Sequence, residues 1–270
     1  MSKAKVIFIT GGSGGIGKST SARDWADDLA GLTGSRVVLV DANLGQQSQR
    51  EFHGLDMSRG LEEADVFDNP LSALITPRDL GHEANYALLP GPLDPRPDNM
   101  PRLLDLLGRT IGALSSHCDW IIVDLDKTDP VILADPSSVQ HAVMTPWVDM
   151  GGARVVWKLE SQVAKLGDGL KALEAWARPR STGIVGVVPT GAPDPSDAQW
   201  ERVVTPYGRF LGAEQWSVDS GRHVASGVVG HADNELTPTV RSVLSYMGCP
   251  QDRLPEPVKR GGRSWFRRRK

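Results

Sequence analysis

A glycine-rich run near the start of the chain has the residue types that bind phosphate. It follows the apolar segment Val6–Ile9 and precedes a stretch with helical spacing, Thr20–Leu32. Glycines let successive backbone amides face one anion, a lysine reaches the terminal phosphates, and a following hydroxyl suits a magnesium ion. We therefore predict a loop that binds a nucleoside triphosphate. Its predicted binding residues are Gly12, Ser13, Gly14, Gly15, Ile16, Gly17, Lys18, Ser19 and Thr20.

Two aspartates that end apolar segments are the predicted partners of this loop. Asp41 follows Arg36–Val40, and Asp124 follows Trp120–Val123. The carboxyl ends of parallel strands meet at one edge of a sheet, where ligands bind. Asp124 suits a Walker B carboxylate that holds magnesium through water, and Asp41 suits the nucleophilic water or the metal shell. The alternative is that each aspartate only caps a turn. The predicted metal residues are Ser19, Asp41 and Asp124, and weaker candidates are Asp126 and Asp129.

The order of apolar segments predicts an α/β fold, a doubly wound and mostly parallel sheet flanked by helices. Apolar positions from Val156 to Ala177 predict one or two helices that cover the sheet, with a coiled coil as the alternative. The predicted strands are Val6–Ile9, Arg36–Val40, Tyr86–Leu89, Trp120–Val123, Ala142–Met144 and Ile184–Val188. The predicted helices are Thr20–Leu32, Pro101–His117 and a last one that Thr237 caps and Gly248 ends.

Composition places the chain among ordinary globular proteins, since 40% of its 270 residues are hydrophobic and 23% are charged. No apolar run approaches the roughly 20 residues that cross a bilayer, and no signal peptide is evident. We expect a cytoplasmic protein. Cys118 and Cys249 have no metal-ligand spacing and are expected to be buried thiols.

The charge of the chain is unevenly distributed. The last twelve residues hold seven basic residues and no acid, which leaves 23 basic against 33 acidic residues in the rest. We predict one domain over residues 1–250 and a basic tail over residues 251–270. The predicted contacts of this tail with DNA or an anionic membrane are Arg263, Trp265, Phe266, Arg267, Arg268, Arg269 and Lys270. The alternative is a tail that only adds solubility.

The order and spacing of these motifs resemble the ParA/MinD ATPases over most of residues 3–190. The landmarks are the phosphate loop, Val37–Gly45, Leu88–Gly91, Cys118–Asp124 and Val143–Pro146, the last of which resembles a strand and its exit. The resemblance implies a P-loop fold that dimerises face to face around two ATP molecules, with magnesium, and that holds DNA or membrane in this state. It also implies a partner protein that stimulates hydrolysis, with Asp41 opening switch I and Asp124 opening switch II.

Two positions depart from the family pattern. The family carries an extra lysine that reaches the nucleotide of the partner subunit, and Ser13 stands at that position. Switch I of the family carries a second aspartate that orients the attacking water, and Asn43 stands there. Asparagine holds a water but does not accept its proton as a carboxylate does. We therefore expect a weak ATPase, slow or dependent on a partner, with Lys18, Asp41, Asn43 and Asp124 as its catalytic residues.

Three functional classes remain open. The first is an ATP-switched protein for the positioning or partition of DNA, or of a DNA-transfer or envelope complex. The second is a MinD-like regulator attached to the membrane by the tail, and the third is a P-loop metabolic synthetase or small-molecule kinase, which also lacks the extra lysine. Pro189 and Thr190, after a predicted strand, are weak candidates for the base site.

Overall fold

The part of the chain that the structure describes forms one seven-stranded parallel sheet with the strand order β3-β2-β4-β1-β5-β6-β7. The computed structural model describes residues 3–80, 83–192, 198–215, 226, 228–229 and 236–255. The strands are β1 (Lys5–Gly11), β2 (Val37–Asp41), β3 (Ala87–Leu89), β4 (Trp120–Lys127), β5 (Ala153–Glu160), β6 (Val185–Thr190) and β7 (Arg209–Phe210). The order reverses on either side of β1, so the predicted doubly wound sheet is confirmed.

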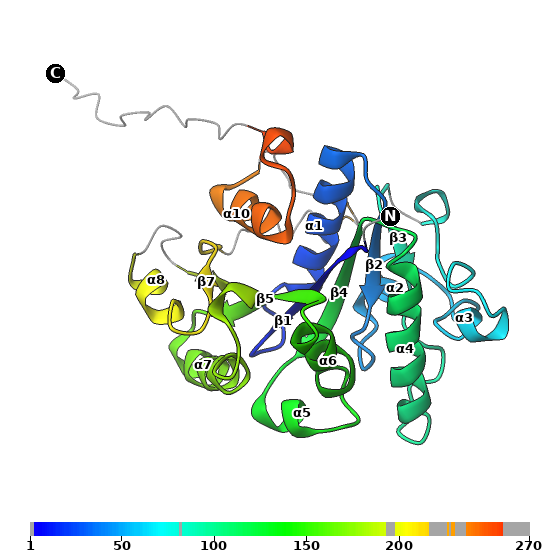
Figure 1. Cartoon of the computed structure of the whole chain (residues 1–270), viewed down its shortest axis with the longest axis horizontal. Coiled ribbons are helices and arrows are strands. Elements are labelled where there is room, and N and C mark those ends of the chain that lie inside the picture. The colour runs from blue at the N-terminus through cyan, green and yellow to red at the C-terminus, as the bar shows by residue number, and fades with distance from the viewer. Residues whose placement is uncertain are drawn as a thin grey trace.

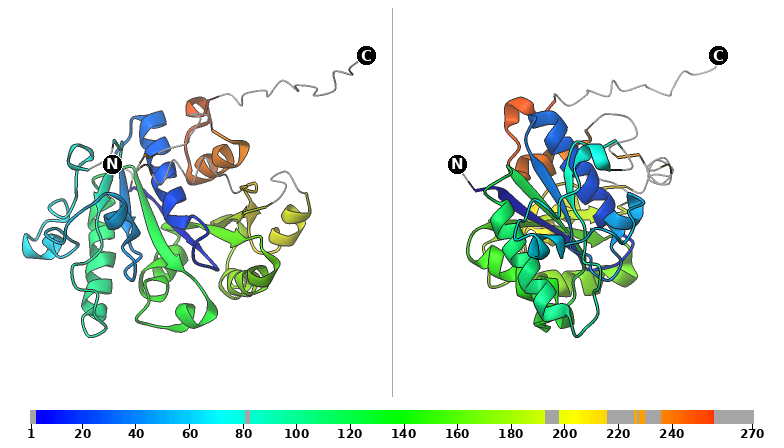
Figure 2. Two further views of the ribbon diagram at one scale, coloured as in Figure 1. Left: turned by 180° about the vertical axis from the view of Figure 1, so that it is seen from behind. Right: turned by 90° about the vertical axis from the view of Figure 1, so that its right-hand side faces the viewer.

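Helices cover both faces of the sheet, as Figure 1 shows. One face packs against α1 and α10, and the other against α4, α6 and α7. Both views of Figure 2 keep α1 and α10 together on one side. The helices are α1 (Lys18–Thr33), α2 (Ser48–Phe52), α3 (Glu63–Val66), α4 (Met100–Leu114), α5 (Pro130–Ala134), α6 (Thr145–Asp149), α7 (Val163–Ala177), α8 (Ala198–Val204) and α10 (Pro238–Met247).

The predicted strand at Ala142–Met144 is wrong. Residues Gln140–Met144 form a π-helical turn that leads into α6, where Pro146 takes an early helical position. Val143 and Met144 are buried, but they pack in the core beside α4 and not in the sheet. Alanine and methionine favour helix, and this preference outweighs the single β-branched residue. The predicted resemblance of Val143–Pro146 to a strand and its exit is therefore a misassignment.

The predicted helical pattern from Val156 to Ala177 is wrong in its first part. Val156 and Leu159 belong to β5, the strand that pairs with both β1 and β6. Lys158 interrupts the apolar run of this strand and Glu160 ends it, although both are buried, so the pattern lacks the continuous apolar residues that mark an inner strand. Only α7 is the predicted covering helix, and its residues Leu173 and Ala177 pack on the sheet.

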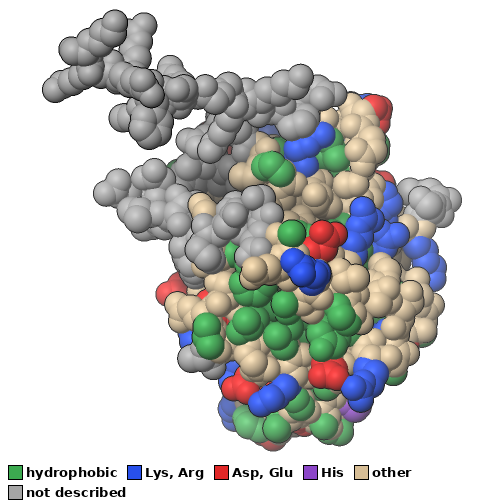
Figure 3. All heavy atoms as spheres, turned by 90° about the vertical axis from the view of Figure 1, so that its left-hand side faces the viewer, with side chains coloured by type: hydrophobic (Ala, Val, Ile, Leu, Met, Phe, Trp, Pro, Cys, Tyr) green, Lys and Arg blue, Asp and Glu red, His purple; other side chains and the backbone are tan. Residues whose placement is uncertain are grey.

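The side of the molecule that carries α7 and α8 shows hydrophobic side chains at its surface (Figure 3). Both helices contribute exposed valines, Val163 and Val203. Within the described part of the chain, no helix has the length and apolar character needed to cross a membrane. The basic tail predicted to contact DNA or membrane, from Arg263 to Lys270, lies outside the described residues.

Candidate functional site

The glycine-rich run forms a loop that connects β1 to the first turn of α1. Gly15 and Gly17 take left-handed backbone angles, with φ of 73° and 76°. Gly17 precedes α1 and offers no side-chain cap, so the first amides of the helix are left to a ligand. The Lys18 ammonium folds back and donates to the Ser13 carbonyl at 2.9 Å. These features are those of the predicted phosphate-binding loop.

Packing holds the start of this loop against α7. A Cβ atom at Gly12 would lie 2.4 Å from the Cα atom of Gly169, so residue 12 has no room for a side chain. Gly169 interrupts the apolar pattern of α7, and a Cβ atom there would lie 2.9 Å from Leu159 Cδ1. The loop is therefore fixed between α1 and α7.

Asp41 and Asp124 lie side by side at the carboxyl edge of the sheet. They are direct partners in the parallel ladder between β2 and β4, and their exposed fractions are 1% and 0%. One oxygen of each carboxylate is occupied: Asp41 Oδ2 accepts from the amides of Gln49 and Arg50 at 3.0 and 3.1 Å, and Asp124 Oδ2 accepts from Gln49 Nε2 at 2.7 Å. The Oδ1 atoms of both are buried and accept no hydrogen bond from the described residues.

Burial shifts the ionisation of these groups. It raises the pKa of Asp41 to about 7, with a further contribution from the charge of Asp124. It also raises the pKa of Asp124 to about 6, although hydrogen bonds from Ser19 and Gln49 oppose the shift. Burial lowers the pKa of Lys18, and the charges of Asp126 and Asp124 oppose this change. A cation beside the two carboxylates would restore their ionised state.

The residues at this edge fit a magnesium ion that is also held by a nucleotide. Two buried carboxylate oxygens have no partner in the described protein, and Ser19 adds a hydroxyl next to Asp124. Magnesium prefers oxygen ligands and usually binds through one or two carboxylates together with phosphates and water. The described residues contain no group of three or more His, Cys, Asp and Glu side chains that could hold a metal, so a cation here would also need ligands from the nucleotide or water.

Asn43 lies in the loop after β2, and it is 2% exposed. Its Nδ2 donates to the Ser48 hydroxyl at 3.2 Å and approaches Gln46 Oε1 at 3.4 Å. Its Oδ1 is buried and accepts nothing from the described residues. The structure therefore brings Asn43 to the same edge as Asp41 with an oxygen available to a water molecule, while its catalytic role stays a prediction.

The weaker candidates of the β4 loop differ in what they do. Asp126 lies near enough to Lys18 to affect its pKa. Asp129 caps α5 instead, because its Oδ1 accepts from the amides of Val131 and Ile132, both at 2.9 Å. Asp129 therefore has the structural role that turn-forming aspartates often have.

The two candidates for the base site end β6. Thr190 pairs with Glu214, and the Glu214 amide donates to the Pro189 carbonyl at 2.8 Å. Pro189 and Thr190 therefore lie at the same edge of the sheet as the phosphate-binding loop, but β1 and β5 separate them from β4. Their assignment to the base stays a prediction.

Sequence reasoning missed a buried lysine beneath the loop. Lys158 of β5 is 2% exposed, and its ammonium donates to Ser21 Oγ at 2.6 Å, to Glu214 Oε2 at 2.7 Å and to the Gly17 carbonyl at 3.5 Å. It therefore links the loop, the first turns of α1 and the segment after β7. A lysine inside the otherwise apolar run Val155–Leu159 is the signal that could have identified it.

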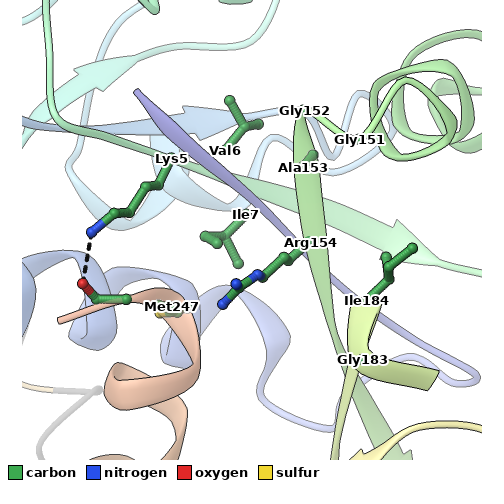
Figure 4. Close-up of a pocket in the computed structure, with 11 residues that line it drawn as sticks. Lys5, Val6, Ile7, Gly151, Gly152, Ala153, Arg154, Gly183, Ile184 and Met247 are labelled. Atoms are coloured by element: carbon green, nitrogen blue, oxygen red, sulfur yellow. Dashed lines mark hydrogen bonds between the residues drawn. The ribbon is translucent and has the colours of Figure 1, made fainter. Parts of the chain in front are cut away.

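The cavity of about 360 Å³ drawn in Figure 4 lies at the opposite edge, where β1 and β5 begin. Lys5 donates to the Gly248 carbonyl at 2.7 Å, and Arg154 donates to the Tyr246 carbonyl. Both cations therefore cap the carboxyl end of α10, which explains them structurally. This cavity is not the candidate site, since ligands of such sheets bind beyond the carboxyl ends of the strands.

Comparison with known proteins identifies the fold. No family model matches the chain. A stretch of 65 residues, 24% of this chain and 22% of the relative, is 43% identical to the septum site-determining protein MinD of Helicobacter pylori. The ATP complex of a single-residue variant of Cyanothece McdA has a TM-score of 0.65 at 20% identity and covers 93% of this chain and 99% of McdA. A ParA family ATPase of Chlorobium tepidum TLS has a TM-score of 0.65 at 15% identity and covers 90% and 98%.

These similarities confirm the resemblance that the sequence motifs predicted. The chain has the fold of the MinD and ParA ATPases, with its glycine-rich loop between β1 and α1. The sequence match spans about a fifth of the length of the curated relative. The activity, substrate and partners of this chain are therefore proposals.

The buried carboxylates predict how stability depends on pH without magnesium and nucleotide. The pKa of Asp41 in the folded protein, about 7, exceeds the unfolded value of about 4, so the folded state binds more protons between these values and the free energy of unfolding falls as pH rises. Asp41→Asn keeps an oxygen acceptor for the two amides and removes the charge. Urea unfolding should show that the advantage of Asp41→Asn over the wild type grows by at least about 1 kcal/mol from pH 5 to pH 8.

The exposed Asp98→Asn variant is the control for the loss of one surface carboxylate. An Asp41→Asn difference that does not change between pH 5 and pH 8 would contradict the assigned burial penalty.

The Lys158–Glu214 ion pair predicts unequal costs for its two partners. Glu214→Ala leaves a buried ammonium without its carboxylate, and we expect a loss of about 3 kcal/mol in the free energy of unfolding. Lys158→Met costs less, because the Glu214 side chain is 22% exposed and can turn to water. In urea unfolding, the double variant should cost less than the sum of the single variants. Equal single costs that simply add would contradict this account.

Proposed function

We propose that this chain is an ATP-binding molecular switch of the ParA/MinD type that dimerises face to face in its ATP state. Its task is the positioning or partition of DNA, or of a DNA-transfer or envelope complex, in the cytoplasm. One observation carries the proposal. Lys18, Ser19, Asp41 and Asp124 converge at one edge of the sheet, and two carboxylate oxygens there are buried and accept no hydrogen bond from the described residues.

Different residues at this edge bind the phosphates and the cation. The amides of Gly14–Ser19 surround the phosphates, and Lys18 turns from the Ser13 carbonyl to the terminal phosphates. Ser19, Asp41 and Asp124 hold magnesium, which neutralises phosphate charge when it is bound. The McdA complex with ATP, a protein of the same fold, supports ATP as the nucleotide.

The proposed switch hydrolyses ATP slowly, and a partner protein accelerates it. Asn43 offers a buried oxygen that can orient a water but cannot take its proton. Ser13 has no charge to reach the nucleotide of a second copy. The γ-phosphate is therefore retained until a partner completes the site, which gives the dimer its lifetime.

The tail favours a second candidate function, a MinD-like regulator on an anionic membrane. Trp265 and Phe266 stand among arginines, which is a composition that suits the membrane interface. The same charges would bind DNA phosphates without reading sequence. DNA remains the first choice, because phosphate binding needs only the positive charges of the tail.

A turnover assay tests the weak-ATPase prediction. The protein alone should release phosphate at well below about one per second, the lower end of the usual enzyme range. Asn43→Asp should raise turnover by about tenfold or more, because it restores a proton acceptor. Ser13→Lys should raise turnover only in the dimer, so its effect should depend on protein concentration. Lys18→Ala is the control for contaminating ATPase. Wild-type turnover above about one per second would contradict the prediction.

A comparison of binding surfaces tests the proposed function. Sedimentation in ATP should show a dimer that is absent in ADP and in Lys18→Ala. Only the ATP form should bind double-stranded DNA of arbitrary sequence, and this binding should weaken with salt and on removal of the residues after Pro257. Tail-dependent pelleting with anionic liposomes instead would favour the membrane regulator. A protein that binds ATP without dimerising or attaching to either surface would favour the metabolic enzyme.

A further inference from the structure

The side chain of Gln49 is polar and fully buried, and it has none of the proposed nucleotide-binding roles. It lies in α2, the short helix that follows β2 in the predicted switch I segment (Figure 1). Its Nε2 donates to Asp124 Oδ2 at 2.7 Å and to the Ser19 carbonyl at 3.0 Å. The carboxamide therefore lies between the Walker B carboxylate and the phosphate-binding loop.

Arg23 determines which end of the carboxamide faces Asp124. Its Nη1 donates to Gln49 Oε1 at 3.0 Å, and its guanidinium lies over the Phe52 ring, 3.5 Å from the ring centre. Only the oxygen of the carboxamide can accept from arginine, so the NH₂ group must point to Asp124. The orientation of Gln49 is thus set by a buried network that joins α1 to α2.

The backbone of the same residue holds the other carboxylate. The Gln49 amide donates to Asp41 Oδ2 at 3.0 Å. One residue therefore binds an oxygen of Asp41 and an oxygen of Asp124, and in both carboxylates Oδ1 is the atom that accepts nothing from the described residues. The position of α2 and the orientation of both carboxylates depend on each other.

We propose that Gln49 is a positioning residue for magnesium, which holds the Asp124 carboxylate so that Oδ1 faces the cation and which ties the position of α2 to the presence of that cation. The inference rests on the proposed nucleotide site. A neutral donor suits this place, because an apolar side chain would remove the hydrogen bond from Nε2 to Asp124 Oδ2. Groups that orient metal-binding side chains typically contribute about tenfold or more to metal affinity.

The effect of magnesium on nucleotide affinity tests this role of Gln49. A fluorescent ADP analogue is titrated into the full-length protein with EDTA and with saturating magnesium, and the ratio of the two affinities measures the contribution of the cation. In Gln49→Met we expect this ratio to fall by about tenfold while the affinity in EDTA stays within about twofold of the wild type. Hydrogen exchange of residues 46–52 should become slower with magnesium in the wild type and should not respond to it in Gln49→Met.

Gln251→Met, an exposed glutamine beside α10, is the matched control and should behave as the wild type. Gln49→Asn keeps a polar side chain that is too short to reach Asp124, so it should show the same loss if Gln49→Met does not fold. An equal fall in affinity with and without magnesium would reduce Gln49 to a packing role and overturn the inference. A larger magnesium effect in Gln49→Met would also overturn it, because the carboxamide would then compete with the cation.

A failure of the proposed function would give a different experimental result from a failure of the Gln49 proposal. If the wild-type protein bound no ADP analogue in either buffer, the nucleotide site itself would be refuted. A wild-type protein that binds the analogue with a magnesium effect unchanged in Gln49→Met would leave the proposed function in place and refute only the role of Gln49.

Discussion

The parallel register between β2 and β4 places the Asp41 carboxylate beside that of Asp124, and the surrounding groups are arranged around these two buried acids. Like charges repel strongly where water is excluded, so each acid needs hydrogen bonds or a cation. The start of α2 supplies the hydrogen bonds through its backbone amides and the Gln49 side chain. Arg50 then fixes α2 by donating to the carbonyls of Asp56, Arg59 and Gly91. The conformation of the segment after β2 is thus linked to the charge state of the two acids.

The buried basic side chains near these two acids differ in how firmly protein groups hold them. Arg23 is bound to Gln49, and Lys158 is bound to Glu214 and Ser21. Lys18 donates to a carbonyl of its own loop, a bond that a phosphate oxygen can replace at little cost. Lys18 therefore has charge to offer an anion, whereas Lys158 serves to hold the loop to β5. This difference explains how Lys158 can lie under the proposed phosphate site without replacing the lysine that is absent at Ser13.

Local sequence patterns predicted two kinds of element: those that are uniformly apolar and those whose stabilising contacts are close in the sequence. β1, β2 and β4 are continuous apolar runs, α1 and α4 have regular apolar spacing, and Thr237 caps α10 as its side chain predicted. β5 escaped prediction because its polar residues find partners far along the chain, as Lys158 does with Glu214. Gln49 escaped because it stands in a polar run, Gln46–Gln49, in which nothing distinguishes the buried glutamine from the exposed one. Its burial depends on Arg23 and Asp124, and such long-range partners are not visible in one sequence.

The two buried acids, Asp41 and Asp124, also explain the effect of an asparagine at position 43. It lies 2% exposed beside Asp41, and its backbone amide helps to keep the pKa of that carboxyl from rising further. An aspartate at this position would add a third buried carboxylate, and its charge would raise the pKa of Asp41 again. Such a trio would depend on a bound cation more strongly than the present pair, whose Oδ2 atoms accept hydrogen bonds from α2. The loss of a proton acceptor at residue 43 is therefore coupled to a gain, because the site holds two buried carboxylates instead of three and needs less positive charge to offset them.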